Sequence, residues 1–422
     1  MIFVLGYFYP VIGALGKPLL MGLTGLWVID LLLLFRSQHP IKAHRGLPER
    51  FSNGDPNPIN VEIQNRYPFD VSLEIIDELP FQFQVRDHKI TLQLSSHNKH
   101  KISYNLRPTE RGDYTFGALN IFTASPIGLV QRRFQFDEQQ TVPVYPSFIQ
   151  MRKFELYAIS DRLTDIGIKK IRRLGHTLEF DQIREYVRGD DVRSINWKAT
   201  ARRNELMVNQ YHDERSQQVY SVIDMGRTMK MPFEGLSLLD YAINTSLIIS
   251  NIALQKHDKA GLITFSDKPG PKVPAQKKHS HIYRIQEALY NLDTDFNESD
   301  FSRLYLSLKQ HVRQRSLILL YTNFETLSAM RRQLPYLKRI ASDHLLVTIF
   351  FQNTELDELL NSKADSEEEI YTKVIAEKFS HEKKTIVQEL NQMGVQTILT
   401  PPAELSVNTI NKYLELKARG VI

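Results

Sequence analysis

Oxygen-bearing side chains follow two apolar runs in the C-terminal half of the chain. Asp224 and Thr228 come after the run 219–223, and Asn323 follows the run 316–321. If both runs are parallel strands, their carboxyl ends meet at one edge of a sheet, where such sheets bind ligands. A carboxylate, a hydroxyl and an amide oxygen suit Mg²⁺. Because only the carboxylate is charged, the pattern predicts a weak magnesium site or no cofactor at all.

A second place for chemistry is the adjacent carboxylate pair Asp190 and Asp191. Paired carboxylates can hold a divalent cation that activates water, so this pair with His176 is compatible with a metal-dependent hydrolase. Arg188 and Arg193 flank the pair and compete for the same carboxylates. We therefore expect no catalytic residues and no enzyme activity, and the hydrolase stays open as the alternative.

Both carboxylates belong to a dense mixed-charge segment that runs from residue 173 to residue 202. Arginine forks pair bidentately with carboxylates, which predicts ion pairs inside the segment. The same charges can form a recognition surface for another protein, and the two interpretations are compatible. The residues assigned to this candidate partner-binding surface are Glu179, Arg184, Tyr186, Asp190, Asp191, Arg193, Trp197 and Arg202.

The composition excludes several other kinds of site. The chain of 422 residues contains no cysteine, which rules out disulfides and thiolate chemistry. It contains no Walker glycine loop, no H-E-x-x-H and no G-x-S-x-G. Lys and Arg outnumber Asp and Glu by 53 to 48, but the basic residues are scattered along the chain. We therefore expect no nucleic-acid partner.

The apolar patterns predict two folded domains that position these residues. Residues 50–148 alternate apolar and polar side chains in short stretches bounded by turn formers, which predicts a small antiparallel β-sandwich. In residues 219–422, continuous apolar runs alternate with amphipathic helices. That order is typical of an α/β domain whose parallel sheet is covered on both faces. The mixed-charge segment then lies in the connection, residues 149–218.

The first 35 residues are apolar and contain only two charged side chains, Lys17 and Asp30. The stretch is longer than the ~20 residues that one membrane-spanning helix needs. Gly16-Lys17-Pro18 interrupts it with turn-forming residues, so we favour a transmembrane hairpin within residues 1–36 and keep a single span as the alternative. We expect Asp30 to have a structural role near the membrane interface, because it lies close to the end of the apolar stretch.

Basic residues follow the apolar stretch. They are Arg36, Lys42, Arg45 and Arg50, opposed only by Glu49. A basic flank marks the cytoplasmic side of a membrane protein. The sequence therefore predicts a protein of the bacterial inner (cytoplasmic) membrane whose soluble domains are cytoplasmic.

The segment Asp224-Met225-Gly226-Arg227-Thr228 resembles the metal-binding motif of von Willebrand factor A domains, in which Asp-x-Ser-x-Ser follows the first strand. Gly226 and Thr228 stand in place of the two serines, and Asn323 stands where such a domain usually has an aspartate. The resemblance implies a von Willebrand factor A-like, Rossmann-like fold with a degenerate metal site.

The mixed-charge segment resembles the signature of the family named domain of unknown function 58, R-G-x-G-x-E-F-x-x-x-R-x-Y-x-x-G-D-D-x-R-x-I-x-W-x-A-x-A-R. All eight residues assigned above to the candidate surface match it. Two upstream stretches resemble further elements of the family, Arg111-Gly112-Asp113-Tyr114 and Ser125-Pro126-Ile127-Gly128-Leu129, the latter with Ser125 in place of an aspartate. The resemblance implies a membrane-anchored adaptor whose partner is a cytoplasmic MoxR-type AAA+ ATPase, acting in envelope or complex maturation.

Overall fold

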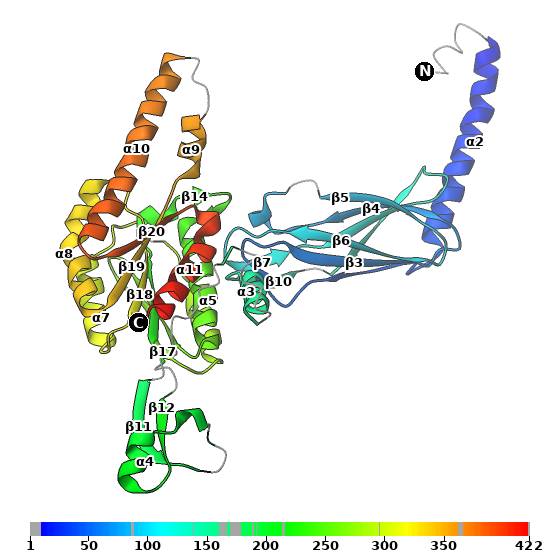
Figure 1. The fold of residues 1–422 in the computed structure, drawn as a ribbon. Helices are drawn as coiled ribbons and strands as arrows, with labels where there is room; N and C mark the ends of the chain where they lie inside the picture. Colours follow the sequence, from blue (N-terminus) through cyan, green and yellow to red (C-terminus); the bar gives the residue numbers. More distant parts are fainter. Residues whose placement is uncertain are drawn as a thin grey trace. The chain divides into compact units, whose positions relative to one another are not determined.

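The computed structural model describes residues 10–85, 88–137, 139–159, 167–168, 179–187, 190, 192–212, 216–294, 296–361 and 366–420. The chain divides into two compact units, Met1–Tyr145 and Pro146–Ile422. The first unit consists of a helix and β-sheets, and the second is a layered α/β unit (Figure 1).

The described part of the first unit begins with one continuous helix, α2 (Pro10–Phe35). Its stretch Pro18–Phe35 has a mean hydropathy of 2.0 and is long enough to cross a membrane, as a membrane anchor or a signal sequence would be. Because α2 runs through Gly16-Lys17-Pro18, the predicted hairpin is wrong, and one helix replaces it. A helix pairs its backbone groups internally, which matters more in an apolar environment than the turn preference of glycine and proline.

The strands of the first unit form three sheets, in the orders β1-β3-β6, β5-β4-β8-β9 and β2-β10-β7. The strands are β1 (Ile41–Gly46), β2 (Phe51–Ser52), β3 (Asn57–Asn65), β4 (Val71–Asp77), β5 (Lys89–Leu94), β6 (Lys99–Leu106), β7 (Gly112–Phe116), β8 (Leu119–Ala124), β9 (Gln131–Phe136) and β10 (Gln140–Tyr145). A 3₁₀ turn, η1 (Phe81–Phe83), follows β4. Neighbouring strands are antiparallel except for the parallel pair of β2 and β10.

Alternation of buried and exposed residues builds the core of this unit, because successive side chains of a strand point to opposite faces. In β3, every second residue is buried. Val61 and Ile63 from β3 share one hydrophobic cluster with Leu73 from β4 and Ile121 from β8. Since β3 and β4 belong to different sheets, the sheets pack against each other as a sandwich.

The second unit contains a six-stranded sheet in the order β17-β16-β13-β18-β19-β20. The strands are β13 (Gln218–Asp224), β16 (Lys259–Phe265), β17 (Pro269–Gln276), β18 (Leu317–Tyr321), β19 (Leu345–Phe351) and β20 (Gln396–Thr400). The helices of the α/β layers are α3 (Phe148–Ile159), α5 (Leu238–Gln255), α6 (His281–Tyr290), α7 (Phe301–His311), α8 (Leu327–Asp343), α9 (Thr354–Asn361), α10 (Glu367–Gln392) and α11 (Leu405–Ala418). Short elements complete the unit: η4 (Arg227–Lys230), β14 (Pro232–Phe233), β15 (Leu236–Ser237) and η5 (Pro402–Glu404).

The sheet is mixed, so the expectation of a wholly parallel sheet needs correction. β17 runs antiparallel to β16, whereas the other neighbouring strands are parallel. β17 has no continuous apolar run that would mark a buried strand, and it contains three prolines. Proline lacks the N–H that an interior strand must donate, so it is tolerated at the edge of a sheet, where β17 lies.

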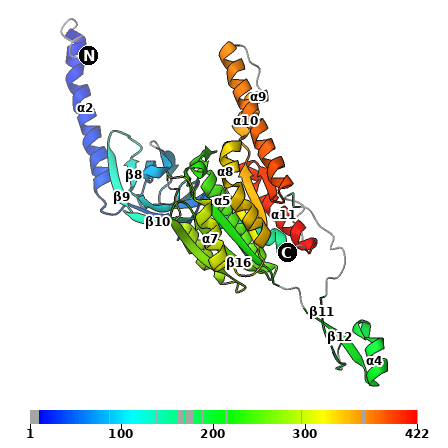
Figure 2. The same ribbon diagram turned by 90° about the vertical axis from the view of Figure 1, so that its left-hand side faces the viewer.

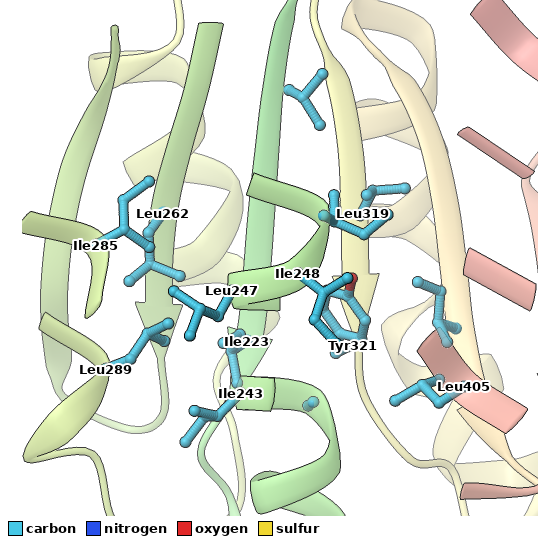
Figure 3. Close-up of a cluster of buried hydrophobic side chains, with 14 of the residues drawn as sticks. Ile223, Ile243, Leu247, Ile248, Leu262, Ile285, Leu289, Leu319, Tyr321 and Leu405 are labelled. Atoms are coloured by element: carbon cyan, nitrogen blue, oxygen red, sulfur yellow. The ribbon is translucent and has the colours of Figure 1, made fainter. Parts of the chain in front are cut away.

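Helices cover both faces of this sheet. Alternate residues of β13 enter two separate clusters: Ile223 packs with residues of α5, α6 and α11, and Val222 packs with residues of α7, α8 and α10. Figure 3 shows the first cluster, in which Leu247 and Ile248 of α5 lie against the strands near Ile223. Burying each of these side chains contributes roughly 1.5–3 kcal/mol, which holds the strand ends in place.

Candidate functional sites

The reversal of strand order in the α/β sheet creates a switch point between β13 and β18. From β13 the chain continues to β16 on one side, whereas β18 is followed by β19 on the other. In open α/β sheets, ligands bind at such a point, beyond the carboxyl ends of the strands. Asp224 ends β13 here, and Thr322 and Asn323 follow β18. A cleft of about 270 Å³ lies at this position, and Asp224, Thr228 and Asn323 all line it.

The carboxylate of Asp224 is buried and engaged on both oxygens. Oδ1 accepts hydrogen bonds from the backbone N–H of Gly226 at 2.8 Å and from the Ser299 hydroxyl. Oδ2 accepts from the Thr322 hydroxyl at 2.6 Å. Burial raises the pKa of Asp224, and these three donors oppose that shift. The carboxylate therefore has hydrogen-bond donors but no positive charge among them.

A positive charge does reach the neighbouring Asn323. The ammonium Nζ of Lys383, from α10, donates to Oδ1 of Asn323 at 2.5 Å. The Asn323 Nδ2 points to the backbone oxygen of Thr228 at 3.4 Å. Burial lowers the pKa of Lys383 to about 8, and the nearby Glu325 carboxylate opposes this shift.

As arranged, the three residues expected to hold magnesium do not fit a divalent cation. Both Asp224 oxygens are already occupied, and the Asn323 oxygen faces an ammonium that would repel a second positive charge. A hard cation needs several oxygens turned toward one point. The structure brings Asp224, Thr228 and Asn323 to one cleft. The Asn323 oxygen, which a metal would need as a ligand, accepts a hydrogen bond from Lys383 instead.

Sequence reasoning missed two residues of this cleft region, Ser299 and Lys383. Ser299 lies just before α7, far from Asp224 in the sequence, and no motif surrounds it. Lys383 is one of several lysines on α10. Only the packing of α10 against β20 and α8 distinguishes it from the others.

The mixed-charge segment forms a hairpin of its own. Strands β11 (Glu179–Glu185) and β12 (Met207–His212) pair antiparallel, and η3 (Val192–Ser194) and α4 (Trp197–Arg203) lie in the connection between them. The region from β11 to β12 is termed here the signature hairpin. Helix α4 lies beside β12 in both views (Figure 1, Figure 2).

One of the two adjacent carboxylates is held inside the signature hairpin. Asp190 accepts from Arg184 Nη2 at 2.6 Å and from the backbone N–H of Val187 at 2.9 Å. These hydrogen bonds hold the pKa of Asp190 below its usual range. An arginine therefore engages this carboxylate, as the sequence suggested. Asp191 and the side chains of Glu179 and Arg193 lie outside the described residues.

Asn196 orders the start of α4. Its Oδ1 accepts from the backbone N–H of Ala199 at 3.0 Å, and its Nδ2 donates to Asn209 Oδ1 of β12 at 2.8 Å. The next residue, Trp197, is 69% exposed. Tyr186 is half-buried, and its N–H donates to the Leu206 carbonyl at 2.8 Å. Further exposed side chains of the hairpin are Ile183, Val187, Val192, Lys198, Arg202, Arg203 and Leu206.

In the first unit, the side chain of the buried Asp30 connects α2 to the sandwich through hydrogen bonds. Its Oδ2 accepts from the backbone N–H groups of Leu129 and Val130, both at 2.8 Å, and its Oδ1 accepts from the Ser125 hydroxyl. Ser125 is the residue that departs from the family element quoted above, and it meets Asp30 directly. The role of Asp30 in this structure is therefore that of a connector between helix and sheet.

Arg45 does not belong to the basic flank in which the sequence placed it. Its side chain is fully buried and donates to Asp77 Oδ1 at 2.5 Å. Arg132 instead lies at the end of α2 and donates to the carbonyls of Leu34 and Ser37 at 2.7 and 2.8 Å. A cation at a helix C-terminus is favourable because the helix dipole is negative there.

Comparison with known proteins identifies related sequences. Residues 182–369 match the family described as "Protein of unknown function DUF58". The uncharacterized protein YeaD of Bacillus subtilis (strain 168) is 26% identical over 125 residues, which cover 29% of this chain and 30% of that protein. The match thus spans less than a third of that relative.

Two solved structures share weaker likeness. The conserved hypothetical protein BatB from Bacteroides thetaiotaomicron is 12% identical; the match covers 48% of this chain and 100% of that one, with a TM-score of 0.32. The ASH/PapD-like domain 7 of human CEP192 is 17% identical, over 26% of this chain and 87% of that one, with a TM-score of 0.22. Both scores are too low to establish a shared fold.

Proposed function

Since the chain belongs to the DUF58 family of proteins of unknown function, we propose that it is a membrane-anchored adaptor. Its partner is a cytoplasmic MoxR-type AAA+ ATPase, and the two proteins act in envelope or complex maturation. The adaptor contacts the ATPase through the signature hairpin. The family match covers residues 182–369, which include most of this hairpin and much of the α/β sheet.

The exposed Trp197 carries this proposal. A tryptophan that is 69% exposed leaves a large apolar surface in water, and tryptophan and arginine are enriched at the centres of protein interfaces. The capping of α4 by Asn196 and the bond from Arg184 to Asp190 order the backbone around it. A preordered surface loses less conformational entropy when it binds. The exposed Arg202 adds charge for recognition and steering.

Membrane anchoring belongs to the same proposal and is supported by α2. Its apolar stretch Pro18–Phe35 has the length of a membrane span, and Arg36 and Lys42 remain exposed beyond it. Arg45 is buried and does not contribute to the basic flank of α2, but Arg132 places another basic group at the end of this helix. We retain the cytoplasmic orientation on this charge pattern.

A von Willebrand factor A-like fold for the second unit is also part of the proposal. It is supported by the doubly wound sheet, by Asp224 at the switch point and by Thr228 and Asn323 in the same cleft. The alternative of a metal-dependent hydrolase at Asp190 loses support, because Arg184 and the Val187 N–H already engage that carboxylate.

Affinity purification of the tagged full chain from detergent-solubilised membranes tests the adaptor. We expect a MoxR-type ATPase to co-purify with the wild type and to be depleted at least ~tenfold with Trp197→Ala, because an interface tryptophan commonly contributes 2 kcal/mol or more. Phe81→Ala is the matched control, because it removes an aromatic side chain that is 86% exposed in the first unit. Equal recovery of the ATPase with both variants, or its absence from the wild-type sample, contradicts the proposal.

A further inference from the structure

A larger cavity adjoins the cleft at the switch point. It has a volume of about 540 Å³ and shares Asn323, Glu325 and Thr326 with that cleft. Small-molecule sites in proteins commonly have volumes of roughly 300–1,000 Å³. The cavity therefore has room for a ligand larger than an ion.

Apolar side chains from several elements form most of its wall. Phe233 comes from β14, Phe351 from the end of β19, Leu399 from β20 and Phe379 from α10. Residues near the carboxyl ends of β19 and β20 thus face a helix that covers them. Such a wall favours an apolar ligand body, because contact with these side chains removes apolar surface from water.

One partly buried charge in this wall, that of Lys383, does not match its apolar surroundings. Lys383 lines the cavity and donates to the neutral amide oxygen of Asn323 at 2.5 Å. Lys384 also lines it from an exposed position, and among the described lining residues the one carboxylate is that of Glu325, which is likewise exposed. Two lysines against one glutamate leave this described part of the lining positive. An ammonium in an apolar wall is stabilised most by a charged acceptor, so the cavity is complementary to a carboxylate.

We propose that this cavity binds a small amphipathic carboxylate, with its carboxylate on Lys383 and its apolar body against Phe233, Phe351 and Phe379. The ligand is a small molecule rather than an acidic side chain of a partner protein. Aspartate or glutamate would satisfy Lys383 but would leave most of the apolar wall uncovered. This inference does not depend on the adaptor function, since the cavity lies in the α/β sheet and not in the signature hairpin.

Calorimetric titration of the full chain in detergent with octanoate tests the site. Uptake of octanoate by micelles is the same for every variant and is subtracted with empty micelles. We expect saturable binding to the wild type and an affinity at least ~tenfold lower for Lys383→Met, which keeps the length of the side chain and removes its charge. Lys378→Met is the matched control, because this exposed lysine of α10 lies outside the cavity lining.

Two further ligands separate the charge from the apolar body. Octanol lacks the carboxylate, so we expect it to bind at least ~tenfold more weakly than octanoate and to be indifferent to Lys383→Met. Acetate lacks the apolar body and should show no saturable binding. Equal affinities of wild type and Lys383→Met for octanoate, or no heat beyond that of micelles, overturn the proposal.

A second variant decides the matter if Lys383→Met does not fold. Phe379 lines the cavity from a partly exposed position on α10, so Phe379→Ala can be made without opening the core. We expect it to weaken octanoate binding about tenfold through lost apolar contact. Unchanged octanoate affinity in Phe379→Ala contradicts the proposed placement of the ligand.

Discussion

Asp77 in the sandwich and Asp224 in the α/β unit are both buried, but they are stabilised in different ways. In the sandwich, Asp77 meets the guanidinium of Arg45 at 2.5 Å and also accepts from a tyrosine hydroxyl. In the α/β unit, Asp224 accepts from one backbone N–H and two hydroxyls. The first carboxylate is neutralised by a cation, whereas the second is held by neutral donors.

The surroundings of the two carboxylates explain what each can do. The Arg45 side chain, which is fully buried, also donates to the carbonyls of Gly117 and Asp137, at 3.0 and 2.7 Å. That ion pair is complete and serves the fold. Asp224 instead lines a cleft at the switch point, next to the cavity that contains Lys383. A buried carboxylate whose described hydrogen-bond donors are all neutral, placed at a ligand-binding position, marks a functional site more clearly than a fully paired one.

The largest effect should come from breaking the pair in the sandwich. Arg45→Met leaves the Asp77 charge buried without its cation, so we expect the unfolding free energy of the first unit to fall by ~3–5 kcal/mol. Hydrogen exchange of peptides from β4 and β8 reports the stability of this unit by itself. Lys101→Met is the control: its pair with Glu62, at 3.6 Å, is exposed on the same unit and should contribute no more than ~0.5 kcal/mol.

Removing the charge of Asp77 as well should restore part of that loss. The double variant Arg45→Met with Asp77→Leu removes both charges, so we expect it to be more stable than Arg45→Met alone. If the double variant loses at least the sum of the two single losses, the pair is not the coupled unit described above.

A smaller, pH-dependent effect should follow from Asp224→Asn. Asparagine keeps the shape of the side chain: its Oδ1 can still accept from the Gly226 N–H and the Ser299 hydroxyl, and its Nδ2 can donate to the Thr322 hydroxyl, so we expect a loss of about 1 kcal/mol near neutral pH. Because burial raises the pKa of Asp224, the folded state keeps a proton that the unfolded chain loses above about pH 3.9. The stability that Asp224 contributes is therefore greatest at or below about pH 4 and falls as pH rises through the folded pKa.

Comparing the two proteins across pH measures this difference. The advantage of the wild type over Asp224→Asn should shrink between about pH 4 and the neutral range, as followed by hydrogen exchange of peptides from β13 and β18. An advantage that grows with pH would show that the carboxylate has a cation partner, as Asp77 has.

The smallest expected effect is that of magnesium. Since an ammonium already occupies the Asn323 oxygen, we expect millimolar Mg²⁺ to leave the melting temperature of the wild-type full chain unchanged. Lys383→Met frees that oxygen and removes the repelling charge, so any response to Mg²⁺ should be larger in this variant. A rise in the wild type that Asp224→Asn abolishes would show that the cleft holds a metal after all.

The sequence by itself determined the elements and the family. Apolar runs placed β13, β16, β18 and β19, because a strand buried on both faces must be apolar throughout, and a shorter run placed the edge strand β20. Alternation placed the sandwich strands β3, β4, β5, β6 and β10, because one of their faces remains polar, whereas β1 lies before the predicted domain. The sequence did not predict the edge strand β17 or the helix α7, since neither has a long apolar run. The family was recognised from local spacing alone, and the match over residues 182–369 confirms it.

Only the tertiary structure decided the partners of Arg45 and Lys383. Arg45 looked like part of a membrane flank, but the pairing of β1 with β3 buries it with Asp77. Nothing in the sequence distinguishes Lys383 from the other lysines of α10, but the packing of α10 against β20 brings it to Asn323. The strength of an electrostatic interaction depends on the distance between the groups and on their burial. Lys383 and Asn323 are 60 positions apart in the sequence, so folding alone brings them close together and shields them from water.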